Sequence, residues 1–173
     1  MKDQDHTKLP SGRDIPLLLL GIIGIGASGP IIAKSLMPVP TMIFWRNFIG
    51  GLFMAPFALK RKEWRTLNQR KAILWSALGG VFLAFHFICF FWAMKYTSVA
   101  TGTALTATQP IFVALFIKFK GGHIPKKSFI GIFIAFISVI VITGIDLNLS
   151  VRSFQGDLLA IAGGALAAAY VLV

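Results

Sequence analysis

Charged side chains are scarce in this sequence, and acidic side chains are the scarcest. Asp and Glu together account for only 6 of the 173 residues, and all charged residues together for 13%. A soluble globular domain is roughly a quarter charged. Because 56% of the residues are also hydrophobic, a soluble domain is excluded and a protein embedded in the lipid bilayer is indicated.

Residues that catalysis or metal binding would need are also missing. The single cysteine, Cys89, can form neither an intrachain disulfide nor a cysteine-rich metal site. The sequence has no Walker phosphate-binding loop, no HExxH zinc motif, no nucleophile elbow and no pair of carboxylates within its apolar runs. These absences argue against an enzyme, and we predict neither a cofactor nor a metal ion.

What the sequence does contain is a series of long apolar runs. They cover residues 15–33, 42–59, 72–94, 99–117 and 129–145, and a sixth begins at Leu158 and is still apolar at Val173. Each complete run is close to the roughly 20 residues that a helix needs to cross the hydrocarbon layer. Backbone N–H and C=O groups find no partner in hydrocarbon, so the runs predict helices. The predicted fold is an all-α, polytopic transmembrane bundle of five complete helices and a truncated sixth.

The lysine and arginine residues lie mostly on one side of this predicted bundle. Of the 17 cationic residues, 13 fall in the N-terminal tail and in the second and fourth connections, whereas only Lys34, Lys95 and Arg152 fall on the other side. Cationic connections stay in the cytoplasm, so the N-terminus is predicted to be cytoplasmic. This distribution accounts for the net charge of +11 without nucleic acid as a partner.

The topology also predicts how the chain is divided. Residues 1–14 form a cytoplasmic tail, residues 15–146 a five-helix repeat, and residues 147–173 an outside loop followed by the start of a second repeat. Five helices that start inside must end outside, so a second five-helix unit would be inverted. Inverted repeats are a common plan of secondary transporters, with the substrate site near the midplane of the membrane.

Polar residues within the apolar runs are the candidates for such a site. The third run carries a small and polar stripe, and the fourth carries an amide beside a proline. We expect a substrate cavity lined by Arg46, His86, Trp92, Tyr96 and Gln109. The same residues also fit helix packing and interfacial anchoring, and this alternative stays open. No Asp or Glu lies inside the first five runs, and Asp146 and Asp157 are expected at helix ends outside the membrane.

Several stretches together resemble a known family. Residues 93–100 (AMKYTSVA) and 109–112 (QPIF) lie around the third and fourth predicted helices, and three further stretches are residues 44–47 (FWRN), 131–142 and 156–159 (GDLL). This combination resembles the EamA family of the drug/metabolite transporter superfamily over about residues 15–173. The resemblance implies ten helices in two inverted five-helix repeats, both termini in the cytoplasm, and efflux or exchange of amino acids, metabolites or drugs.

The sequence therefore predicts a small-solute transporter of the inner membrane that works by alternating access. Its expected partners are the lipid bilayer, a small-molecule substrate, and either its own missing C-terminal half or a second chain. The alternative is a non-transporting membrane component, or a truncated remnant that needs a partner chain.

Overall fold

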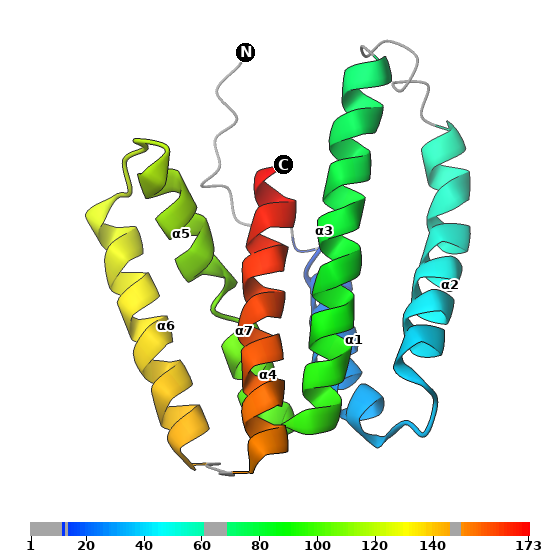
Figure 1. Ribbon diagram of the computed structural model, residues 1–173. Helices are drawn as coiled ribbons and strands as arrows, with labels where there is room; N and C mark the ends of the chain where they lie inside the picture. Colours follow the sequence, from blue (N-terminus) through cyan, green and yellow to red (C-terminus); the bar gives the residue numbers. More distant parts are fainter. Residues whose placement is uncertain (1–11, 13, 61–68, 146–149) are drawn as a thin grey trace.

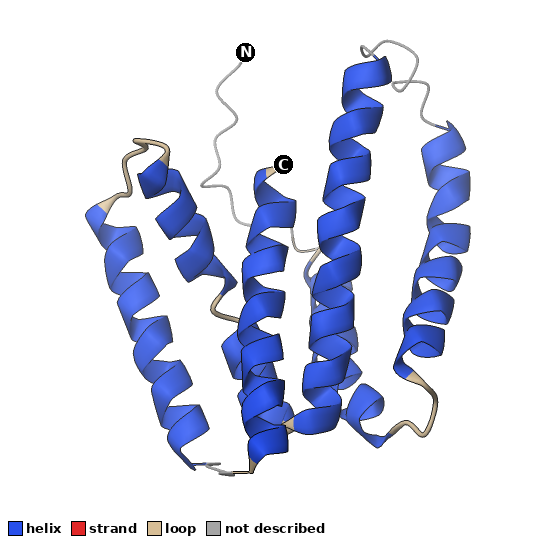
Figure 2. Ribbon diagram, viewed as in Figure 1, coloured by secondary structure: helices blue, strands red, loops and turns tan. Residues whose placement is uncertain are grey.

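The chain folds entirely into helices wherever its structure is described. The computed structural model describes residue 12, residue 14 and residues 15–60, 69–145 and 150–173. Within these ranges there are seven helices and no strand (Figure 2). The helices are α1 (Ile15–Lys34), α2 (Val39–Lys60), α3 (Gln69–Tyr96), α4 (Val99–Thr106), α5 (Gln109–Phe119), α6 (Lys126–Ile145) and α7 (Val151–Leu172). The predicted all-α bundle is confirmed.

Five segments of the described chain are long and apolar enough to cross a membrane. They are Ile15–Lys34, Val39–Leu59, Arg70–Tyr96, Val99–Phe119 and Val151–Leu172, and α6 contributes a shorter apolar stretch, Ser128–Val141. Most of their large apolar side chains are exposed in the isolated chain. Helices of this length that expose so many large apolar side chains are suited to a hydrocarbon environment, so the chain is an integral membrane protein. The cationic tail and most of the second connection lie outside the described residues.

The fourth predicted helix is broken in the structure. α4 ends at Thr106 and α5 begins at Gln109, with Ala107 and Thr108 between them. Pro110 in the first turn of α5 has no backbone N–H, so a continuous ladder of hydrogen bonds cannot pass through it. At the break, the Leu105 carbonyl oxygen accepts hydrogen bonds from both the Thr108 hydroxyl, at 2.6 Å, and the Thr108 backbone N–H, at 3.2 Å.

The sixth helix starts earlier than the apolar run predicted. α7 begins at Val151 rather than at Leu158, because Ser150 caps its N-terminus. The Ser153 backbone N–H donates to the Ser150 hydroxyl oxygen at 3.1 Å, which satisfies one of the donors that a helix start leaves free. The first two turns of α7 are polar, so hydropathy alone could not reveal them.

α7 occupies a central place in the bundle. Figure 1 shows it between α3 on one side and the α4–α5 and α6 segments on the other, with α2 at the outer edge beyond α3. α7 packs mainly against α3 and, less extensively, against α4 and α5. The buried apolar core lies near the turn that joins α3 to α4 and consists of Ile32, Val39, Phe91, Ala93, Met94 and Ala160.

A lysine joins α1 to α3 at this end of the bundle. The Lys95 ammonium group donates to the Ala33 carbonyl oxygen at 3.3 Å and also to the Ser35 carbonyl oxygen. A cation at a helix C-terminus satisfies free carbonyl groups and complements the helix dipole. This contact fixes the end of α1 beside the end of α3.

Candidate functional site

The face of α7 that packs against α3, α4 and α5 consists of small residues. We call this interface the α7 seam, and its buried α7 residues are Ser153, Gly156, Ala160, Gly163, Gly164, Ala167 and Ala168. A Cβ atom on Gly156 would lie 2.7 Å from the Thr97 backbone nitrogen, and one on Gly164 would lie 3.0 Å from the Thr106 carbonyl oxygen. Only glycine permits backbones to approach this closely, and such small-residue contacts are what hold helices together in lipid.

Side chains from three helices bond to the backbone of α7 across this seam. His86 Nδ1 on α3 lies 2.8 Å from the Gly163 carbonyl oxygen, and since a carbonyl can only accept, the ring nitrogen donates. The Thr106 hydroxyl on α4 shares its proton between the Gly102 carbonyl oxygen of its own helix, at 2.8 Å, and the Ala160 carbonyl oxygen of α7, at 3.3 Å. The Gln109 side-chain amide on α5 donates to the Ala167 carbonyl oxygen, also at 3.3 Å.

Two of the predicted cavity residues, His86 and Gln109, therefore meet in the α7 seam. Both are half-buried, and both bond to carbonyls of α7. These bonds account for the polar side chains as packing contacts, and the same positions would let them line a path along α7. Their predicted role in substrate binding stays a prediction.

The other three predicted residues make contacts with aromatic rings. The Arg46 guanidinium on α2 lies 4.0 Å from the centre of the Phe87 ring, in a cation–π contact between α2 and α3. Trp92 and Tyr96 form a ring pair with centres 5.3 Å apart. Tyr96 also faces the Arg152 guanidinium of α7 at 5.1 Å, so this pair adjoins the seam at the N-terminal end of α7.

The predicted position of Asp157 is wrong. Asp157 does not lie at an outer helix end: it lies inside α7, one residue after Gly156 of the seam. Its Oδ1 atom is buried without a hydrogen-bond partner, and it is the only acidic residue within the described helices. The serine at position 150 was the available signal, since a cap there moves Asp157 into the second turn of the helix. Asp146 lies outside the described residues.

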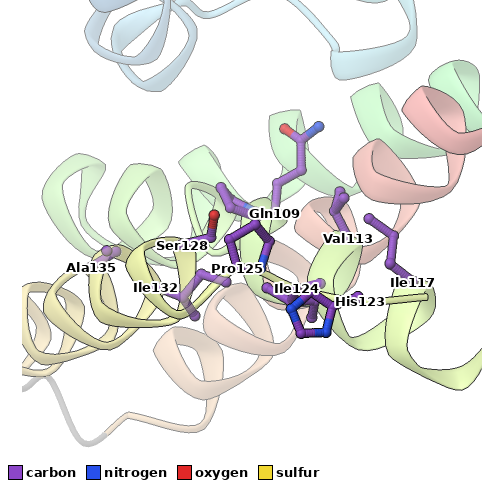
Figure 3. A pocket seen from close by; sticks show the side chains of 12 residues that line it. Gln109, Val113, Ile117, His123, Ile124, Pro125, Ser128, Ile132 and Ala135 are labelled. Atoms are coloured by element: carbon purple, nitrogen blue, oxygen red, sulfur yellow. The ribbon is translucent and has the colours of Figure 1, made fainter. Parts of the chain in front are cut away.

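A groove lies between α5 and α6, on the other side of α5 from its contact with α7. Its volume is about 700 Å³, and most of its lining is apolar. Gln109 is the one predicted cavity residue in its wall, and His123 lies at the connection between the two helices (Figure 3). The lining residues include Pro110, Val113, Ala114, Ile117, Ser128, Gly131, Ile132 and Ala135.

Comparison with known proteins identifies the family of this chain. The model of the EamA-like transporter family matches residues 12–144. This chain belongs to that family. The predicted resemblance is thereby confirmed, and the family and its relatives are transporters rather than enzymes.

Two relatives indicate what kind of protein this chain resembles. It is 36% identical over 142 residues to an "uncharacterized transporter" of Archaeoglobus fulgidus, covering 81% of this chain and 45% of the relative. It is 30% identical over 95 residues to the pseudopaline exporter CntI of Pseudomonas aeruginosa, covering 54% of this chain and 32% of the exporter. The chain thus spans less than half the length of these relatives. No solved structure matches it significantly.

Proposed function

We propose that this chain forms part of a secondary transporter of the inner membrane, with its N-terminus in the cytoplasm, that exports or exchanges small metabolites, amino acids or drugs. Membership of a transporter family and the name of one relative, an exporter, support this proposal. The uneven distribution of cations supports the orientation. The rest of the transporter is either a C-terminal half of the same protein or a second chain.

The observation that carries the mechanism is the α7 seam. α3, α4 and α5 each bond to α7 through a side chain that reaches a helix carbonyl. A helical carbonyl that accepts such a bond also accepts a backbone N–H of its own helix. The interhelical bond can therefore break without leaving a backbone group unpaired. Small residues along α7 allow it to shift against its neighbours, as alternating access requires of one repeat against the other.

His86 and Gln109 are the proposed contacts for substrate in this path. When α7 moves, the His86 ring and the Gln109 amide lose the Gly163 and Ala167 carbonyl oxygens and become free to bond to a polar solute. Trp92 and Tyr96 would offer aromatic faces near the same seam. Arg46 would attract an anionic group of the solute from the neighbouring α2–α3 interface.

Flux measurements on the complete transporter in inverted membrane vesicles test this proposal. A panel of labelled amino acids, metabolites and cationic dyes identifies a solute whose accumulation depends on the protein. We expect Gln109→Leu and His86→Phe to abolish most of that flux while the protein still elutes as one symmetrical peak in size-exclusion chromatography. The matched control is Thr103→Val, because the Thr103 hydroxyl bonds within its own helix, to the carbonyl oxygens of Val99 and Ala100.

The same flux measurement also distinguishes a transporter from a membrane component that does not transport. If both variants fold and keep full flux, the side chains serve packing only and the proposed path is wrong. If the intact protein moves no member of the panel, the chain is a membrane component without transport activity toward these classes.

A further inference from the structure

The groove between α5 and α6 has the features of a lipid site. We propose that it binds one anionic phospholipid, with an acyl chain between the two helices and the headgroup at the connection between residues 119 and 126. This inference does not depend on the transport activity proposed above, because the groove lies on a different face of α5 and shares only Gln109 with the α7 seam.

The groove is shaped for a chain rather than for a compact solute. It is lined by α5, α6 and the connection that joins them, and Figure 3 shows side chains from all three around the same space. Small residues hollow its walls at Ala114 on α5 and at Gly131 and Ala135 on α6. A Cβ atom on Gly131 would meet nothing within 4 Å, so the space beside this glycine is open.

Polarity in the groove is graded along its length. His123 and Ser128 lie at the end nearest the connection, and the α5 and α6 walls further along are mainly apolar, with Val113, Ala114 and Ile132 among them. Gln109, at the far end, donates its amide to the Ala167 carbonyl oxygen of α7. A lipid presents the same gradient, with a polar headgroup at one end and a hydrocarbon chain along the rest.

The charge at the polar end selects for an anion. Residues 118–127 contain four lysines and no acidic residue. Lys118 and Lys120 are at the end of α5, and Lys126 and Lys127 are the first two residues of α6. Basic pockets between transmembrane helices are a known way to bind anionic headgroups.

The alternatives each satisfy only part of these observations. A zwitterionic lipid would fill the apolar walls but would gain little from the four lysines. Another helix of the transporter would also cover the walls, but an apolar helix would offer nothing to Lys118, and among the described residues Lys120 has only its contact with the Phe116 ring, at 4.7 Å from the ring centre. Only an occupant with an apolar tail and an anionic head matches both ends of the groove.

Native mass spectrometry of the complete protein tests the proposal. The purified protein is mixed with equal amounts of palmitoyl-oleoyl phosphatidylglycerol and the phosphatidylcholine with the same chains, and the lipid that stays bound is counted. We expect the wild type to retain phosphatidylglycerol with a preference of roughly tenfold or more, since each nearby lysine favours an anionic lipid. Lys118→Gln combined with Lys126→Gln should remove most of this preference, whereas Lys34→Gln at the opposite end of the bundle should not.

Filling the groove tests the acyl-chain part of the site. Gly131→Leu should abolish lipid retention without disturbing the helix, because the added side chain enters open space. The matched control is Gly50→Leu on α2, where a Cβ atom also meets nothing within 4 Å and which does not line this groove. Ala135→Leu, one turn further along α6, provides a second obstruction should Gly131→Leu fold poorly.

Two results would overturn the proposal. Equal retention of both lipids by the wild type would mean that the lysines do not select a headgroup. Unchanged retention of phosphatidylglycerol in folded Gly131→Leu and Ala135→Leu proteins would mean that the lipid binds elsewhere, and that something other than lipid covers the groove.

Discussion

The α7 seam and the outer faces of α1 and α2 differ in the size of their side chains and in their roles. The seam is buried, rich in glycine and alanine, and crossed by bonds from His86, Thr106 and Gln109. The outer faces carry large side chains such as Leu20, Ile23 and Phe53 that stay exposed. In a bilayer, burying a leucine against another helix gains little, because lipid tails are as apolar as leucine. Small residues and polar contacts, rather than hydrophobicity, therefore decide which helices associate.

The largest effect should come from blocking the closest approach in the seam. In Gly156→Leu the new Cβ atom would lie 2.7 Å from the Thr97 backbone nitrogen, so α7 must move away from α3. We expect a loss of about 3 kcal/mol or more in unfolding free energy, measured by denaturation in detergent micelles. Gly24→Leu on α1 is the control, because a Cβ atom there meets nothing within 4 Å. Equal losses in both variants would show that the seam is not the tighter interface.

Replacing Asp157 should raise the unfolding free energy, whereas Gly156→Leu should lower it. Asp157→Asn replaces a carboxylate whose Oδ1 atom is buried without a partner by a neutral amide of similar shape. A buried carboxylate oxygen without a partner loses its hydration, so we expect the unfolding free energy to rise by about 1 kcal/mol. The thermal midpoint in detergent should rise accordingly. A lower midpoint would mean that the carboxylate has a stabilising partner when the protein is in its membrane.

Breaking a single bond across the seam should have a smaller effect than Gly156→Leu. His86→Phe keeps an aromatic ring beside Phe90 but removes the bond to the Gly163 carbonyl oxygen. Bonds of this kind between membrane helices are worth about 1 kcal/mol, and we expect that loss in the same denaturation measurement.

Ser138→Ala, a change outside the seam, should have the smallest effect on the unfolding free energy. The Ser138 hydroxyl on α6 donates only to the Ile134 carbonyl oxygen of its own helix, so Ser138→Ala should change the unfolding free energy by less than about 0.5 kcal/mol. If Ser138→Ala costs as much as His86→Phe, the His86 bond does not hold the seam.

Much of this fold could be predicted from hydropathy, and the errors have physical reasons. The apolar runs located the transmembrane segments because the thickness of the bilayer sets how many apolar residues a helix needs to cross it. The break between α4 and α5 depends on which carbonyls a proline leaves free, and the start of α7 depends on the Ser150 cap. Neither is an apolar feature, so an apolar pattern could not locate them.

The candidate site could be predicted less completely. His86 and Gln109 stood out as polar groups in apolar runs, and both now contact α7. Their partners could not be predicted, because the partners are backbone carbonyls, which every residue possesses. The small-residue spacing of α7 is visible in the sequence, but such a stripe does not say which helix it faces. Arg46 and Trp92 carried the same polar or aromatic signal and lie outside these seam bonds.

The most direct test of the seam as a moving interface uses the one native cysteine. A Cβ atom on Gly163 would lie 3.5 Å from the Cys89 Cβ atom, a separation that suits a disulfide. In the complete transporter, with any cysteine outside this chain replaced by serine, Gly163→Cys should cross-link α3 to α7 on oxidation. We predict that flux of the identified solute stops on oxidation and returns on reduction. Failure to cross-link would contradict the seam, and undiminished flux through the cross-linked protein would contradict its movement during transport.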